Sequence, residues 1–261
     1  MASHTSRTPS ESRLSTRLSL RWLPDPAFEN TDTIVMSVKG WYVDLRVDRE
    51  SGAIDWAIAG QRVVDSHDPH RVQFTHELDS NNSFDTVDCG TFSTLPNGDD
   101  LETGSMPRPD LPGAPVTAYE EVWRELGFQA GPEGDERGIS WILESKYALP
   151  KDLGDVGEIE VPRTFLARIW GTYLALRQVQ TVILDQRSKT LRAKHGKDVS
   201  ARREEWSQST GWASKYIIGD EGDKLPSMAD IAHEGTEHWG SAGATITVQE
   251  REYTVRAIEI M

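Results

Sequence analysis

Short segments in which apolar and polar residues alternate recur along the chain, with turn-forming residues between them. The clearest series lies in residues 33–60, where TIVMSV, WYVDLRVD and AIDWAIAG are joined by short connections that contain Gly40 and Gly52. Alternation of this kind is typical of half-buried β-strands, and short glycine-containing connections favour hairpins. In the middle segment one face carries Trp41, Val43, Leu45 and Val47, and the other carries Tyr42, Asp44 and Arg46.

The same pattern extends along the rest of the chain. Further strands are predicted at residues 71–79, 88–95, 119–126, 139–149, 212–220, 244–250 and 252–260. The run at 163–184 is long enough for a helix, but Gly171 at its middle favours two strands or one bent strand. The charged segment 188–206 predicts an exposed loop or a short helix, and 227–235 predicts one or two helical turns.

A breaker-rich segment, GFQAGPEGDERG at residues 127–138, is the best candidate for a domain boundary. We therefore expect a disordered tail over residues 1–16 and two β-domains over 17–130 and 131–261. Two runs of strands suggest two small antiparallel β-barrels or one large mixed β-structure, mostly β and with little helix.

The charge balance limits the expected classes of partner, and the cysteine content indicates the redox compartment. The chain has 42 acidic and 28 basic residues, a net charge of −14, which disfavours a nucleic-acid partner. A single cysteine, Cys89, excludes an intramolecular disulfide and suits a reducing cytosol. No segment is apolar for long enough to be a signal peptide or a membrane helix. We expect a cytoplasmic protein with no nucleic-acid or membrane partner.

Motifs for common cofactors are missing from the sequence. It contains no phosphate-binding loop, no dinucleotide fingerprint, no zinc-protease helix and no nucleophile elbow. The histidine pairs His67/His70 and His233/His238 lie in polar loops, and we interpret them as surface residues rather than metal ligands. We expect neither a metal nor a cofactor.

The segment TAYEEVWREL at residues 117–126 has two competing interpretations. Thr117 and Glu120 match a helix capping box, but the alternation and the short distance from Pro115 to Gly127 favour a strand. In a strand Glu120 and Glu121 point to opposite faces and cannot act on one substrate. Tyr119, Glu121 and Trp123 then share one face, which is either core or cavity.

Two polar residues fall among apolar neighbours. Alternation places His76 on the face of Phe74 and Leu78, and Arg168 on that of Leu166 and Trp170. Each is either a partnered core residue or a group that points at a ligand.

Several stretches taken in order resemble one family: RWLPDPA (21–27), IDWAIAG (54–60), THELDS (75–80), DCGTFSTLPNGDDLETGSM (88–106) and YEEVWREL (119–126). They resemble the fungal HRI-type proteins, named for interaction with the yeast kinase Hrr. The resemblance implies two lipocalin-like antiparallel β-barrel domains and a cytoplasmic protein. It also implies a relation to small fungal proteins that act as hetero-Diels–Alderases in tropolone-sesquiterpenoid biosynthesis.

The function expected on this basis is that of a cofactor-independent enzyme that binds hydrophobic small molecules in a barrel cavity. It would join a quinone methide to a terpene alkene by orientation and hydrogen bonding. The alternatives are a kinase-interacting scaffold that uses the Pro-rich loop 107–115, or a lipophile carrier. The predicted catalytic residues are His76, Tyr119 and Arg168. The predicted ligand-binding residues are Trp56, Phe74, Glu121, Trp123, Trp170 and Tyr173.

Overall fold

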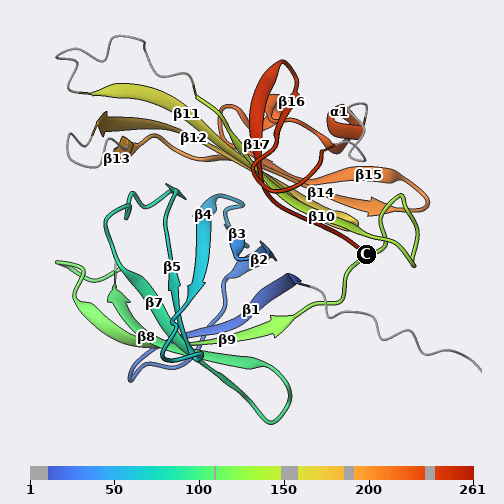
Figure 1. Cartoon of the computed structure of the whole chain (residues 1–261). Helices are drawn as coiled ribbons and strands as arrows, with labels where there is room; N and C mark the ends of the chain where they lie inside the picture. Colours follow the sequence, from blue (N-terminus) through green and yellow to red (C-terminus); the bar gives the residue numbers. More distant parts are fainter. Residues whose placement is uncertain (1–10, 109, 148–157, 185–190, 233–238) are drawn as a thin grey trace, which may run out of the picture.

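The structure of the chain is a computed structural model, which describes residues 11–108, 110–147, 158–184, 191–232 and 239–261. Figure 1 shows two β-domains, with β1 to β9 in the first and β10 to β17 in the second.

The strands of the first domain are β1 (Ser12–Trp22), β2 (Thr31–Val38), β3 (Trp41–Asp48), β4 (Ile54–Val64), β5 (Arg71–Phe74), β6 (Leu78–Asp79), β7 (Asp88–Thr94), β8 (Asp100–Pro107) and β9 (Val116–Glu125). The elements of the second domain are β10 (Ile139–Ser145), β11 (Ile159–Ile169), β12 (Thr172–Leu184), β13 (Leu191–Gly196), β14 (Ser200–Ser207), β15 (Gly211–Ile218), the short 3₁₀-helix η1 (Gly222–Lys224), α1 (Met228–Ala232), β16 (Thr245–Val248) and β17 (Arg251–Ile260).

The first sheet closes into a barrel. Its strand order is β3-β2-β1-β9-β8-β7-β5-β4-β6, and β3 also pairs with β4. All of its strand pairs are antiparallel. Closure leaves the short strand β6 outside the ring, and it removes the exposed edges that an open sheet would have.

The second sheet has the order β15-β14-β12-β11-β10-β17-β16, and β13 pairs with β12. In the described part of the chain its end strands β15 and β16 do not pair with each other, so this sheet is open. The prediction of a mostly β, two-domain fold with little helix is confirmed. The expectation of a second barrel is wrong for the described residues, because only the first sheet joins its own ends.

The expected tail over residues 1–16 is wrong for its last part, because β1 begins at Ser12. Residues 1–10 lie outside the described part of the chain. Strand β1 pairs with both β2 and β9, and Leu14 is buried in the apolar cluster between the domains. The Ser- and Arg-rich composition of this segment suggested a tail, but its two neighbouring strands supply the hydrogen bonds that make it a strand.

The segment 188–206, expected to be a loop or short helix, instead contains β13 and β14. Its charged residues hid the strand pattern because they pair with one another: Arg202 Nε lies 2.6 Å from Glu204 Oε1, and Arg203 Nη2 lies 2.7 Å from Glu205 Oε1. Two strands around Gly171 and a helical turn at Met228–Ala232 are confirmed.

An apolar layer lies between the two domains. On β2 and β3 the outward residues of the barrel are buried against the second sheet, and β2 contacts β10, β11 and β17. Figure 1 shows the second sheet lying across this side of the barrel. The residues of this layer include Ile34, Met36, Val43, Leu45, Val47, Phe165, Ala167, Ile169, Leu174 and Leu176. The barrel therefore has its main apolar contact on its outside, which leaves its inside for other side chains.

Within the described residues, the structure contains no helix that is long and apolar enough to cross a membrane.

Candidate functional site

The inside of the first barrel is polar because alternation sends one set of residues outward and the other inward. On β3 the outward residues Val43 and Leu45 are fully buried against the second domain, whereas Tyr42, Asp44 and Arg46 point into the barrel. The same division holds on β9, where Tyr119, Glu121 and Trp123 face inward.

These inward residues surround a cavity of about 380 Å³. That volume falls in the range of sites for small organic molecules. Its aromatic lining comes from Tyr42, Trp56, Phe74, Phe92, Tyr119 and Trp123. Its charged lining includes Asp44, Arg46, Arg62, Asp88, Glu102 and Glu121. The combination suits a ligand with an apolar body and a polar group.

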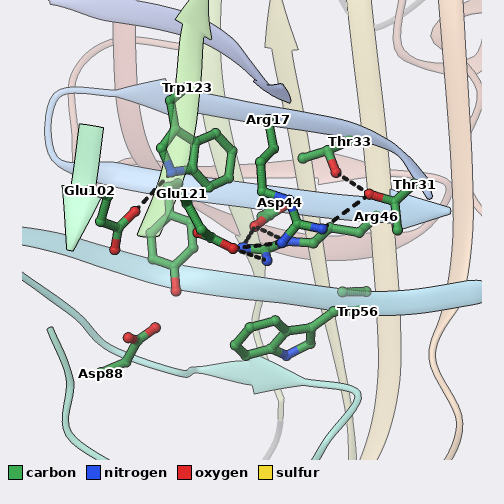
Figure 2. A network of polar contacts seen from close by, with 12 residues as sticks. Arg17, Thr31, Thr33, Asp44, Arg46, Trp56, Asp88, Glu102, Glu121 and Trp123 are labelled. Atoms are coloured by element: carbon green, nitrogen blue, oxygen red, sulfur yellow. Dashed lines mark hydrogen bonds and ion pairs between the residues drawn. The ribbon is translucent and has the colours of Figure 1, made fainter. Parts of the chain in front are cut away.

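Arg46 lies between two tryptophans of the cavity wall (Figure 2). Its guanidinium carbon is 4.7 Å from the ring centre of Trp56 and 5.5 Å from that of Trp123. Its Nε and Nη2 donate to Asp44 Oδ2 over 3.1 and 3.0 Å. Cation–π contact and a buried ion pair together hold this side chain in place.

Glu121 binds two buried arginines. Its Oε1 accepts from Arg17 Nη1 at 2.6 Å and from Arg46 Nη1 at 3.4 Å. Arg17 also binds Glu29, with 2.7 Å between Nε and Oε2. A buried carboxylate requires this kind of compensation, since removing its charge from water is costly. The neighbouring Glu120 points to the other face and pairs with the exposed Arg21, as the alternation predicted.

Glu102 is the other inward carboxyl on the adjacent strand. Its Oε1 accepts from the Tyr119 hydroxyl and its Oε2 from Trp123 Nε1, both at 2.9 Å. Burial, followed by the charge of Glu121, raises the pKa of Glu102 to about 8. Burial and the Glu102 charge likewise raise the pKa of Tyr119. Near neutral pH Glu102 is therefore mostly a neutral carboxylic acid.

Two glycines make room for this pair. A Cβ at Gly90 would lie 2.2 Å from Glu102 Oε1, and a Cβ at Gly104 would lie 2.7 Å from the Tyr119 ring. Any larger residue at either position would displace the Glu102–Tyr119 pair, so both strands need glycine where they pass these side chains.

His76 does not line the cavity but lies behind one of its walls. Its Nδ1 is 2.9 Å from Asp79 Oδ2, and its Nε2 is 3.2 Å from Asp88 Oδ2. Burial opposes a charge on His76, but the hydrogen bonds and charges of Asp79 and Asp88 outweigh it and raise its pKa to about 9. His76 is therefore protonated near neutral pH and positions Asp88, which does line the cavity.

The predicted site residues separate into two groups. Trp56, Phe74, Tyr119, Glu121 and Trp123 all line the one cavity. Figure 2 shows Trp56, Glu121 and Trp123 around Arg46.

Arg168, Trp170 and Tyr173 belong to the second domain and are not among the cavity-lining residues. Arg168 Nε donates to Trp170 O at 2.7 Å, and its guanidinium faces the Trp212 ring at 5.3 Å. Trp170 packs on Phe128, and the Tyr173 hydroxyl donates to Pro226 O at 2.6 Å. These three are buried packing residues of the second domain, apart from the cavity that the first-domain candidates line. The alternation of apolar and polar residues could not separate the two cases, because an inward-facing residue has the same position in the pattern whether the interior is filled or hollow.

Sequence reasoning missed Arg17, Arg46, Arg62, Asp88 and Glu102 as lining or supporting residues of the cavity. For Arg46 a signal was present, since Asp44 and Arg46 share the face of β3 opposite the apolar one. No comparable signal marked Glu102, whose neighbours along the chain are not strongly patterned.

No group of three or more histidine, cysteine, aspartate or glutamate side chains is placed to hold a metal ion within the residues that the structure describes. His67 and His70 are exposed. His233 and His238 lie outside the described residues.

The fold and the cavity define a two-domain β-protein whose first domain is a closed antiparallel barrel that contains a cavity of ligand size. The family model described as Protein HRI1 matches residues 13–256, and the chain belongs to this HRI1 family. The family resemblance is thereby confirmed across both domains.

Among solved structures, the chain is similar to the crystal structure of an uncharacterized protein, YLR301w, from Saccharomyces cerevisiae. The TM-score is 0.63 at 17% identity, and the match covers 95% of this chain and 99% of that one. At this identity the likeness supports the fold alone. A comparison with curated proteins gives no match.

Proposed function

We propose that this chain binds a hydrophobic small molecule with a polar group in the cavity of its first barrel. The observation that carries the proposal is the cavity of about 380 Å³ with six aromatic and several charged residues in its lining. A barrel that served only as a stable scaffold would be expected to fill its interior with side chains.

The division of side chains supports binding over a purely structural role. The apolar layer that stabilises the barrel is on its outside, so the interior aromatics are not needed as its main core. Those aromatics offer flat apolar surfaces, and the buried Arg46 and Glu102 offer fixed polar groups beside them. Preformed walls of this kind reduce the entropy cost of holding a ligand.

Filling the cavity tests the proposal directly. Ser37 lines the cavity on β2, whereas Ser105 is exposed on β8 and is not among the lining residues. We expect Ser37→Trp to weaken binding of a neutral hydrophobic fluorophore by about tenfold or more, because the added ring occupies ligand space. Ser105→Trp is the matched control and should bind normally. Wild-type affinity in a folded Ser37→Trp variant would contradict the proposal.

Catalysis in fungal terpenoid secondary metabolism is a second candidate, of the hetero-Diels–Alderase kind that the family resemblance suggested. The observation in its favour is the Glu102–Tyr119 pair beside aromatic walls, where a hydrogen-bond donor could polarise a carbonyl. Orientation of two bound partners would supply the remaining rate gain. The purified protein should change the product stereochemistry when a quinone methide precursor reacts with a terpene alkene; an unchanged product mixture would exclude this candidate.

A kinase-interacting scaffold in the cytoplasm is a third candidate, favoured by exposed apolar residues at one end of the barrel. Phe28, Leu111 and Val116 are exposed there, next to the contact between Arg108 and Asp25. Co-purification of a kinase that is lost in a Leu111→Asp, Val116→Asp variant would support it. Retention of the kinase by that variant, or a non-cytoplasmic location of the tagged chain, would count against it.

A further inference from the structure

Two inward carboxyl groups lie directly opposite each other on β8 and β9, and only one of them is compensated. Glu102 and Glu121 are register partners. Glu121 binds Arg17 and Arg46, whereas in the described part of the chain no cation lies within ion-pair distance of Glu102. Carboxyls in such different surroundings take different protonation states, one charged and one neutral.

The charged and titratable groups around Glu102 come from four strands. They are Glu121 and Tyr119 on β9, Asp88 on β7, Arg46 on β3 and Arg62 on β4. Arg46 favours a charge on Glu102, but it is already engaged by Asp44. Glu121 and Asp88 oppose that charge. The balance keeps a proton on Glu102 to higher pH than on an ordinary carboxyl.

The hydrogen bonds of Glu102 leave this proton free for a ligand. Tyr119 O–H and Trp123 N–H each donate to one carboxyl oxygen of Glu102. In both contacts Glu102 is the acceptor, so neither contact occupies the proton of its carboxylic acid. Glu102 lines the cavity. The neighbouring strand β7 has a glycine, Gly90, where it passes the Glu102 carboxyl, so no side chain from that position contacts it. The O–H donor is therefore available on the cavity side.

We propose that Glu102 donates this hydrogen bond to the ligand, so that the cavity selects an uncharged molecule with a carbonyl or similar acceptor on an aromatic or polyene body. This inference rests on the proposed function, since it requires that the cavity binds a ligand. A carboxylate ligand would meet Glu121 and Asp88, and a molecule without an acceptor would leave the buried donor unpaired.

The ketone fluorophore prodan is a suitable probe, because it is neutral and its emission responds to hydrogen bonding at its carbonyl. We expect prodan affinity to be constant below about pH 7 and to fall as pH rises through about 8, by up to about tenfold per pH unit. The same dimethylaminonaphthalene without its ketone should bind more weakly and without this pH dependence.

Variants at Glu102 distinguish the effect of its hydrogen-bond donor on prodan binding from the effect of its charge. Glu102→Gln can accept from Trp123 and still donate through its amide, so it should bind prodan within about threefold of wild type and lose the pH dependence. Glu102→Leu removes the donor and should weaken binding about five- to tenfold at neutral pH. Glu120→Gln, on the outer face of the neighbouring strand, is the control and should keep the wild-type pH profile.

The outcomes distinguish this inference from the proposed function. Equal binding of both probes with no pH dependence, or an unchanged pH profile in Glu102→Gln, would overturn the role of Glu102 and leave cavity binding intact. Preference for an amine probe, with affinity that rises with pH, would also overturn it. Failure of every probe to bind at any pH would remove the proposed function and this inference together.

Discussion

The two domains place different side chains on the faces that their strands turn away from the shared apolar layer. In the first domain that face carries Arg46, Glu102 and Glu121 around a cavity. In the second domain the corresponding face carries Trp141 and Tyr173, which are fully buried beneath α1 and its neighbouring loops. The same antiparallel strand pattern thus gives a hollow polar interior in one domain and a filled apolar one in the other. The difference lies in closure: a closed barrel surrounds its inner face, whereas an open sheet must be covered.

The largest effect on the free energy of unfolding is expected from a phenylalanine in the shared apolar layer, and it is compared with that from a phenylalanine at the cavity. Phe165 is fully buried, whereas Phe92 is only partly buried in the cavity wall. Phe165→Ala should lower the free energy of unfolding by about 3–5 kcal/mol, and Phe92→Ala by less than half of that. Denaturant unfolding measures both. Equal losses would mean that the cavity wall is as much a core as the layer between the domains.

A substitution at Arg46 tests whether the polar interior of the barrel contributes to the free energy of unfolding. Arg46→Met keeps an apolar chain between Trp56 and Trp123 but leaves Asp44 without its ion-pair partner. We expect a loss of about 3 kcal/mol in the free energy of unfolding, because an uncompensated buried charge is costly. The matched control, Arg21→Met, breaks a solvent-accessible pair with Glu120 and one hydrogen bond to Asp25 O, and should cost much less. A variant as stable as the wild type would show that the network is dispensable.

The raised pKa of His76 predicts that the stability of the fold depends on pH. Its pKa is raised from the ordinary 6.5 to about 9, so its stabilising contribution is complete below pH 6.5 and is lost as pH rises through 9. The free energy of unfolding should fall across this window, by up to about 1.4 kcal/mol per pH unit. Glu102 has a raised pKa and contributes a fall in the same direction between its ordinary value of 4.5 and about 8.

The two contributions separate in a Glu102→Gln background. There the remaining fall between pH 7 and 9 should belong to His76 and should disappear when His76→Gln is added. A fall that persists in the double variant would assign the effect to other groups.

The smallest expected effect belongs to Glu120, the outward member of the acidic pair. Glu120→Gln removes one exposed contact with Arg21 and should change the free energy of unfolding by less than about 0.5 kcal/mol. A thermal or denaturant unfolding measurement at moderate salt is sufficient. A larger loss would mean that the outer face of β9 is more tightly packed than its exposure indicates.

Much of the fold could be predicted from periodicity, because the segments now seen as β2, β3, β4 and β9 have strict alternation and clear turns between them. Strands β1 and β14 could not, since their polar residues acquire partners only from neighbouring strands. Leu14 is buried in the apolar cluster between the domains, and Arg203 pairs with Asp32 on β2. Contacts between distant segments supply information that local pattern lacks.

The candidate site shows the same limit. Arg46 and Arg168 both interrupt apolar or aromatic strands and both become buried, yet only Arg46 lines a cavity. Trp123 and Trp170 likewise look alike in the sequence. Which inward face encloses open space depends on how the sheet closes and on how large the facing side chains are. Neither quantity follows from the period of one strand.

The apolar layer on the outside of the barrel has a consequence for how this protein can change over time. Because Val43, Leu45 and their neighbours stabilise the barrel from its outer side, cavity residues outside the ion-pair network, such as Ser37 and Phe92, can vary at a lower cost in folding than residues of the apolar layer. Selection can then alter ligand preference separately from stability, a freedom that proteins with a single shared core do not have. Related chains could therefore keep this architecture while their binding specificities diverge.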